Sequence, residues 1–238
     1  MDARFVVDLL TRKKYDLSSS VLMAWSGGKD SALALHEVLR TGAHDVRALL
    51  TTVTEGFDRV SMHGVRRSLL HAQASSVELP LEEIWIPKNA SNEVYDARMR
   101  EVLMKYKKEG VREVAFGDLF LQDVRKCRED KLGLVAMRGL FPLWGRDTGK
   151  LSREFIELGF RAVVCCVDPR VLPKEYCGRE YDFSFLDSLP SGVDPCGENG
   201  EFHTFVYAGP IFKNEIAIVK GDVVLRDGFW FADVLPRV

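Results

Sequence analysis

The chain has 238 residues, which suits one large or two small domains, and a formal net charge of −2 at pH 7. This balance and a pI near 6.2 argue against a general binder of nucleic acid or anionic membranes, because both need a basic surface. Five cysteines without a Cys-x-x-Cys pair, no signal-peptide pattern and no apolar run of membrane-spanning length are typical of a cytoplasmic protein with reduced thiols.

The first predicted strand, Val21–Trp25, runs into a short polar loop before a helix: Ser26, Gly27, Gly28, Lys29, Asp30 and Ser31. Two glycines let backbone N–H groups approach an anion, and the helix N-terminus adds partial positive charge. Lys29 supplies a full charge, and Asp30 is placed to hold Mg²⁺ against phosphates. The string differs from the Walker A loop and resembles the PP-loop of N-type ATP pyrophosphatases, which implies ATP as ligand. The alternative is a plain Gly-Gly turn with solvated charges.

Strands and helices then alternate. Apolar runs predict strands at 46–53, 84–86, 114–116 and 140–143. Apolar residues that repeat every three to four positions predict four helices: one that ends at Gly42, one at 65–77, one at 92–109 and one that begins after Leu121. This β-α-β-α order predicts an α/β fold, with a parallel, doubly wound sheet and helices on both faces. We assign residues 1–143 to this nucleotide-binding domain.

Open α/β sheets bind ligands at the carboxyl ends of their strands, so polar residues there are candidates for ATP binding. His63 follows the second strand, and Gly117 and Asp118 follow the fourth. An acid directly after a buried strand is costly unless it faces a cleft, whereas a lone loop histidine is equally compatible with a structural role. Arg125 and Arg128 share a face of the next helix, which indicates either substrate contacts or an exposed salt-bridged surface.

From residue 144 the pattern changes to a second, smaller α+β domain, 144–238. We predict a helix at 152–158 and a strand at 161–167, and then an antiparallel meander with strands at 216–220, 223–226 and 229–233 joined by turns at 221–222 and 227–228. The aromatic run at 229–231 is compatible with a buried strand face or with a homodimer contact.

The eight residues that end at Thr204 read Gly-Glu-Asn-Gly-Glu-Phe-His-Thr. The Asn199-Gly pair is a strong signal for a two-residue hairpin, which would place Glu198 opposite Glu201, with His203 on the same face and Thr204 on the other. Opposed carboxylates repel, so a metal, a cation or a shared proton would explain them. We therefore predict that Glu198, Glu201 and His203 join Lys29 and Asp30 in catalysis. The alternative is a solvated polar hairpin.

Together the two motifs resemble the diphthine–ammonia ligase family of ATP pyrophosphatases, the domain-of-unknown-function 71 family. The segment Phe141-Pro-Leu-Trp144-Gly-Arg146 agrees, and the resemblance extends from about Val21 to the end. It implies a nucleotide-binding domain of the HUP type, a cleft to a C-terminal domain, and ATP-dependent amide formation. A carboxylate would be adenylated with release of AMP and pyrophosphate, and free ammonia would then displace AMP. We expect the acceptor to contact Arg125, Arg128, Trp144, Arg146, Asn199 and Thr204.

Two residues depart from the family pattern, since Asn199 stands where Gly is usual and His203 where a second Glu is usual. The variant looks like a bacterial branch, part of which is linked to cobalamin-related salvage. The acceptor therefore stays open between diphthine on elongation factor 2 and another carboxylate. Three hypotheses from other classes remain: a tRNA-modifying sulfur transferase with Cys196 as sulfur carrier, a non-catalytic ATP-binding sensor, and a plain ATP hydrolase.

Overall fold

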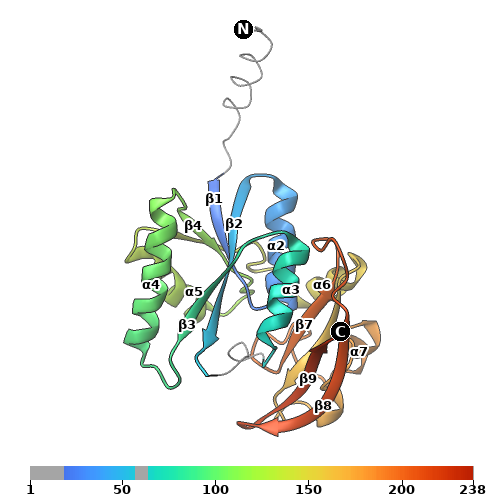
Figure 1. Ribbon diagram of the computed structural model, residues 1–238. Helices are drawn as coiled ribbons and strands as arrows, with labels where there is room; N and C mark the ends of the chain where they lie inside the picture. Colours follow the sequence, from blue (N-terminus) through green and yellow to red (C-terminus); the bar gives the residue numbers. More distant parts are fainter. Residues whose placement is uncertain (1–18, 57–63, 238) are drawn as a thin grey trace.

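The computed structural model describes residues 19–56 and 64–237, so His63 lies outside the described residues. It contains a five-stranded sheet in the order β3-β2-β1-β4-β5, in which every neighbouring pair is parallel. Its strands are β1 (Ser19–Ala24), β2 (His44–Thr54), β3 (Leu81–Ile86), β4 (Glu113–Ala115) and β5 (Arg138–Leu140). This arrangement confirms the predicted doubly wound α/β fold, and the strand order reverses between β1 and β4 (Figure 1).

Helices cover both faces of this sheet: α2 (Lys29–Thr41) and α3 (Arg67–Val77) on one, and α4 (Asn92–Lys108) and α5 (Gln122–Gly133) on the other. The strand period of two explains the division. Val21 and Met23 of β1 join the apolar cluster of α2 and α3, whereas Leu22 joins that of α4 and α5. Gly42 ends α2 as predicted, because its left-handed conformation lets its N–H donate to the Leu39 carbonyl.

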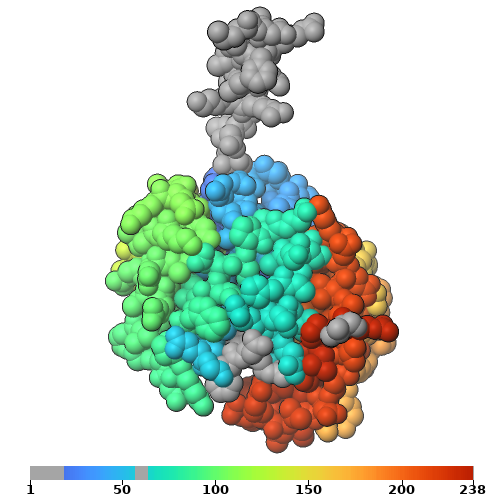
Figure 2. Space-filling view, viewed as in Figure 1, coloured from blue at the N-terminus to red at the C-terminus, as the bar shows by residue number. Residues whose placement is uncertain are grey.

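The C-terminal part forms a smaller antiparallel sheet in the order β7-β6-β9-β8. Its elements are α6 (Thr148–Glu157), β6 (Arg161–Val167), the 3₁₀ helix η1 (Lys174–Tyr176), α7 (Phe183–Ser188), β7 (Phe202–Ala208), β8 (Ile218–Arg226) and β9 (Phe229–Pro236). Helices α2 and α3 lie between the two sheets (Figure 1), and the C-terminal segments run along one side of the N-terminal half (Figure 2). One apolar cluster joins Val21 of β1 to Phe155 and Phe202, so the two halves share a core. The boundary at residue 143 stays a prediction.

Several local predictions are wrong at their boundaries. Strand β8 continues through the expected turn at 221–222, where its pairing with β9 only becomes irregular between Lys220 and Val223. Strand β5 covers 138–140 instead of 140–143, and α6 starts at Thr148 because Asp147 caps it by accepting from the Lys150 N–H at 2.8 Å. The turn at 227–228 is confirmed, since both of its residues have positive φ and join a paired β8–β9 hairpin. In the part of the chain that the structure describes, no helix is long and apolar enough to cross a bilayer.

Candidate active site

The polar loop after β1 lies where the strand order reverses, and hydrogen bonds to strands β2 and β7 hold its backbone and that of the preceding residue. Trp25 N–H donates to the Leu50 carbonyl of β2 at 2.8 Å, and Val206 N–H of β7 donates to the Gly27 carbonyl at 3.0 Å. Gly27 has φ of +78°, and a Cβ atom there would meet the side chains of Gln73 and Leu70 at 2.7 Å. Glycine is therefore required at this position for both its conformation and its packing.

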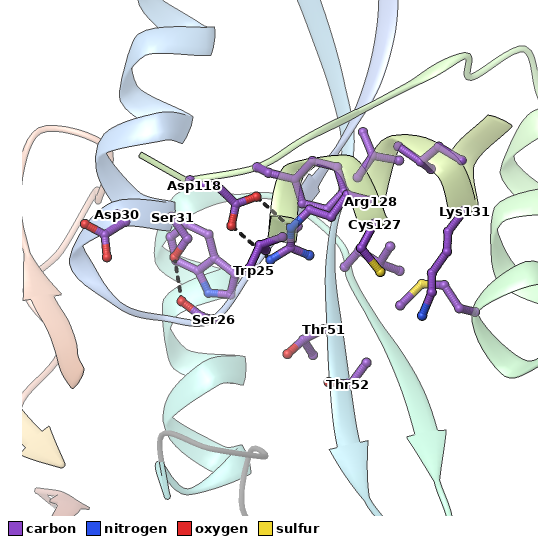
Figure 3. A pocket seen from close by; sticks show the side chains of 18 of the residues that line it. Trp25, Ser26, Asp30, Ser31, Thr51, Thr52, Asp118, Cys127, Arg128 and Lys131 are labelled. Carbon is purple, nitrogen blue, oxygen red and sulfur yellow. Dashed lines mark hydrogen bonds and ion pairs between the residues drawn. The ribbon is translucent and has the colours of Figure 1, made fainter. Parts of the chain in front are cut away.

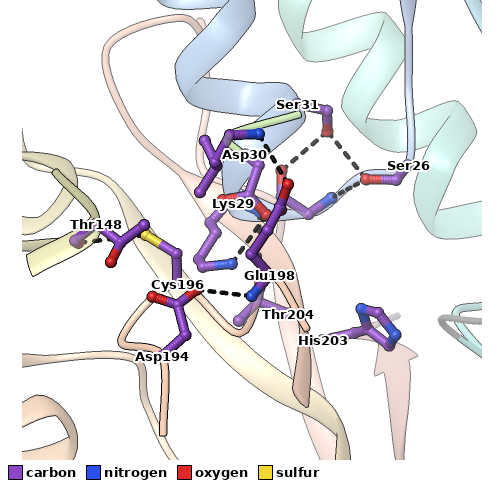
Figure 4. A network of polar contacts seen from close by, with 12 residues as sticks. Ser26, Lys29, Asp30, Ser31, Thr148, Asp194, Cys196, Glu198, His203 and Thr204 are labelled. Atoms are coloured by element: carbon purple, nitrogen blue, oxygen red, sulfur yellow. Dashed lines mark hydrogen bonds and ion pairs between the residues drawn. The ribbon is translucent and has the colours of Figure 1, made fainter. Parts of the chain in front are cut away.

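Lys29 is the first residue of α2 and only 4% exposed. Its Nζ lies 2.9 Å from Asp30 Oδ2 and over the rings of Tyr181 and Phe202, at 5.8 and 5.4 Å from their centroids. Burial acts against the charged form, but the nearby acidic groups, Asp30 foremost, outweigh it and raise the pKa of Lys29. The lysine therefore keeps its positive charge beside the loop (Figure 4).

A pocket of about 750 Å³ opens beside the loop at the carboxyl ends of the parallel strands (Figure 3). Eight of the predicted site residues line it: Ser26, Asp30, Ser31, Gly117, Asp118, Arg128, Glu198 and His203. Side chains such as Leu50, Met99 and Phe116 make another part of the lining apolar. A pocket of this size, with an apolar part and converging polar groups, suits a nucleotide-sized ligand.

Glu198 reaches the polar part of the pocket from the C-terminal half of the chain. Its Oε1 accepts from the Leu119 N–H at 2.8 Å, and its own N–H donates to Asp194 Oδ2 at 2.8 Å. Burial, reinforced by the charges of Asp30 and Asp118, raises the pKa of Glu198 to about 7, although the Leu119 N–H and Lys29 act in the opposite direction. Near neutral pH this carboxyl group can therefore take up or release a proton.

The predicted Asn-Gly hairpin is wrong. Gly200 N–H donates to the Gly197 carbonyl at 3.1 Å, so Glu198 and Asn199 are the central residues of the turn. The residues before Gly197 form another turn and not a strand. Glu201 is consequently buried away from the pocket lining, where its Oε1 accepts from Asn199 Nδ2 at 2.9 Å and from the Asp194 N–H at 3.2 Å. It braces the turn that carries Glu198.

The remaining predicted residues lie outside the pocket lining. Thr204 lies under the loop, where its Oγ1 accepts from the Lys29 N–H at 3.0 Å. The Arg125 guanidinium lies against the rings of both Phe141 and Trp144, 4.6 Å from each ring centroid. Arg146 pairs with Glu154 at a separate hollow between α2 and α6. Arg128 does line the pocket, and its Nε lies 2.6 Å from Asp118 Oδ2 (Figure 3).

Sequence reasoning missed three groups that hold the site together: the Gln73 side chain, the Asp194 carboxylate and the Leu119 N–H. A glutamine among the apolar residues of the helix at 65–77 was a usable signal, because a buried amide needs partners. The Leu119 N–H carries no sequence signal, since every residue except proline has this group.

Two family models match the chain. The diphthamide synthase N-terminal domain matches residues 19–134, and the diphthamide synthase C-terminal domain matches residues 147–234. The diphthine–ammonia ligase of Homo sapiens is 28% identical over 233 residues, covering 88% of this chain and 86% of that protein. The enzyme of the same name from Danio rerio is 28% identical over 235 residues, covering 88% of this chain and 90% of its own length.

Gly117 allows the end of β4 to pack against the loop, and its replacement tests this packing. A Cβ atom on Gly117 would lie 2.7 Å from the Asp30 carbonyl carbon and 2.9 Å from the Ser31 nitrogen, so backbone must move. We expect Gly117→Ala to weaken ATP binding tenfold or more, because a displaced loop would lose at least one charge-assisted hydrogen bond, worth about 1.5 to 3 kcal/mol. Titration calorimetry measures the affinity. Gly133→Ala on α5, where an added Cβ meets nothing within 4 Å, is the matched control. Wild-type affinity in Gly117→Ala would contradict the packing argument.

Proposed function

We propose that this chain, which belongs to the diphthamide synthase family and acts as an ATP-dependent ligase, converts a carboxylate into its acyl adenylate and transfers ammonia to it. The observation that supports this most is the position of the loop. Its Ser26, Asp30 and Ser31 share one pocket with Glu198, which comes from the other half of the chain. The groups that we propose to bind phosphate thus lie beside a carboxyl group whose pKa is raised to about 7, which supports a role in proton transfer.

The chemistry explains the need for ATP. A carboxylate does not accept ammonia at neutral pH, because oxide is a poor leaving group. In the proposed first step an oxygen of the acceptor carboxylate attacks the α-phosphorus, and the bond from this phosphorus to the bridging oxygen breaks to release pyrophosphate. In the second step the ammonia nitrogen attacks the acyl carbon, and AMP leaves.

The loop residues are assigned to the phosphates. The N–H groups of Asp30 and Ser31 at the start of α2 and the hydroxyls of Ser26 and Ser31 would bind the outer phosphates, and Lys29 would offset the charge that develops on pyrophosphate. The adenosine would occupy the apolar part of the pocket, near Leu50 and Phe116.

Mg²⁺ fits this arrangement with Asp30 as its protein ligand. Within residues 19–56 and 64–237 no three His, Cys, Asp or Glu side chains cluster in a way that would hold a metal. Mg²⁺ bound with ATP does not need such a cluster, since one or two carboxylates and phosphate oxygens suffice. Asp30 lines the pocket next to the loop. When bound, the ion would neutralise charge on the departing pyrophosphate.

Glu198 is assigned the proton transfer. Ammonia must lose a proton as it becomes an amide nitrogen, and Glu198 is the pocket carboxyl group whose pKa is raised to about 7. Because Glu198 Oε1 accepts from the Leu119 N–H, Oε2 of the same carboxyl group remains to receive that proton. His203, which also lines the pocket, is placed to contact the acceptor.

For the acceptor we propose a carboxylate of the diphthine type, after the names of the relatives. The alternative is another carboxylate, suited to the Asn199 and His203 variants of the motif. The sulfur-transferase hypothesis has less support, because Cys196 is buried, donates from Sγ to the Thr148 carbonyl at 3.4 Å, and has its pKa raised, chiefly by that burial.

The nucleotide products test the reaction. With ammonium and a competent acceptor, ATP labelled at the α-phosphate should yield labelled AMP, with pyrophosphate in equal amount. Diphthine-bearing elongation factor 2 and a panel of small carboxylates distinguish the two acceptor classes. Recovery of ADP as the nucleotide product would contradict the adenylation step.

Lys29→Met should weaken ATP binding by roughly ten- to a hundredfold, because a charge-assisted contact is worth about 1.5 to 3 kcal/mol. Lys126→Met removes an exposed charge from α5 and is the control. Calorimetry with ATP gives the affinities. An unchanged affinity in Lys29→Met would remove the loop from the nucleotide site.

Glu198→Gln and Glu201→Gln form a matched pair within one turn. Glu198→Gln should keep ATP affinity but slow amide formation by about a hundred- to ten-thousandfold, the usual loss when a general base is removed. Glu201→Gln retains an oxygen that accepts from Asn199 and Asp194, so its rate should stay within about tenfold of wild type. Single-turnover kinetics separate the two steps. Equal losses in both variants would contradict the assignment of the proton transfer to Glu198.

A further inference from the structure

Gln73 of α3 is a polar side chain with an exposed fraction of 0%, and its whole amide group is engaged. Its Nε2 donates to the carbonyls of Gly27, at 2.9 Å, and Val206, at 2.6 Å, and its Oε1 accepts from Trp25 Nε1 at 2.9 Å. Burial of an amide costs free energy that its hydrogen bonds only offset. An apolar side chain would fill this place in the core more simply, so the partners of the amide indicate its role.

One partner of Gln73, the Gly27 carbonyl, belongs to the peptide between Gly27 and Gly28, the only peptide of the loop that is flanked by two residues without side chains. Gly27 and Gly28 carry no Cβ atoms, so the peptide between them can flip with little steric cost. The Gly27 carbonyl accepts from both Gln73 Nε2 and Val206 N–H, which occupies both of its lone pairs. These two donors therefore fix the direction of this carbonyl toward α3 and β7.

The fixed carbonyl also fixes the N–H group on the other end of the same peptide. The described chain contains no cis peptide bond, and in a trans peptide the N–H points opposite to the C=O. Gly28 N–H accordingly points to the opposite side of the loop, where it donates to Ser26 Oγ at 3.2 Å. Ser26 lines the pocket, so this is the side on which phosphates would bind.

We propose that Gln73 is a positioning residue for ATP, which holds the Gly27–Gly28 peptide in the orientation in which the Gly28 N–H donates to Ser26 Oγ and so keeps the Ser26 hydroxyl on the side where phosphates would bind. It also couples this orientation to β7 of the C-terminal sheet through Val206. Thr204 fixes the following peptide in the same way, by accepting from the Lys29 N–H. The inference rests on the proposed role of the loop in ATP binding.

The test compares affinities for ATP and for adenosine in two variants. Gln73→Met retains the approximate volume but none of the hydrogen bonds. Gln73→Glu can accept from Trp25, but it donates to neither carbonyl when ionised and to at most one of them when protonated. We expect ATP to bind about tenfold more weakly to Gln73→Met and weaker still to Gln73→Glu, since lost hydrogen bonds free the peptide to flip. Adenosine, which has no phosphates, should bind within about twofold of wild type.

Leu69→Ala controls for loss of stability, because Leu69 lies on the same helix, is fully buried and packs in a different cluster with Val65 and Phe205. At a temperature where all variants are folded by circular dichroism, it should bind both ligands normally. Wild-type ATP affinity in both Gln73 variants would overturn the proposal, as would a parallel loss of adenosine and ATP affinity. The Lys29→Met variant distinguishes a failure of the positioning role of Gln73 from a failure of the proposed role of the loop in ATP binding. If it loses ATP and the Gln73 variants do not, only the positioning role fails; if it binds ATP normally, the role of the loop itself fails.

Discussion

The contact between the loop at residues 26–31 and strand β7 is the constraint from which the rest of the site follows. Two loop main-chain groups, the Gly27 carbonyl and the Lys29 N–H, are hydrogen-bonded to Val206 and Thr204 of the C-terminal sheet. A Gly-Gly loop has many accessible conformations, and its ordering has an entropic cost that these contacts offset. The C-terminal half therefore completes the loop, which agrees with the apolar core that the two halves share.

Because β7 is fixed against the loop, the turn that precedes it brings Glu198 to the pocket. The electrostatics of this region follow from one buried cation among several acids. Burial acts against the charge of Lys29, but the attraction of the nearby acidic groups, Asp30 foremost, exceeds this penalty and raises the pKa of the lysine. The same burial and the neighbouring charges of Asp30 and Asp118 make the ionised form of Glu198 less favourable. Burial and the neighbouring charges thus affect the two groups differently. They keep Lys29 positively charged, and they raise the pKa of Glu198 to about 7, where it can exchange a proton.

Arg125 and Arg128 are neighbours on one helix face in the sequence prediction, but packing places their side chains in different surroundings. Arg125 and Arg128 lie three residues apart on α5, yet only Arg128 lines the pocket, where it pairs with Asp118. Arg125 lies against the rings of Phe141 and Trp144 and also pairs with Glu129 at 2.8 Å. The aromatic rings of Phe141 and Trp144 thus hold Arg125 outside the pocket that Arg128 lines.

The sequence alone determined the parallel α/β sheet, the loop at its switch point and the clustering of Asp118 with the loop. These features depend on local signals, namely hydrophobic period, glycine conformations and the rule that strand ends converge. It did not determine the turn at 197–200, because the Asn-Gly preference for a hairpin requires two paired strands and only β7 is present on one side. Nor did it identify the Leu119 N–H or the three contacts of Gln73, which join residues far apart in the chain. Only the tertiary structure could decide these, since a main-chain group or a buried amide acquires its role from whichever distant groups packing brings to it.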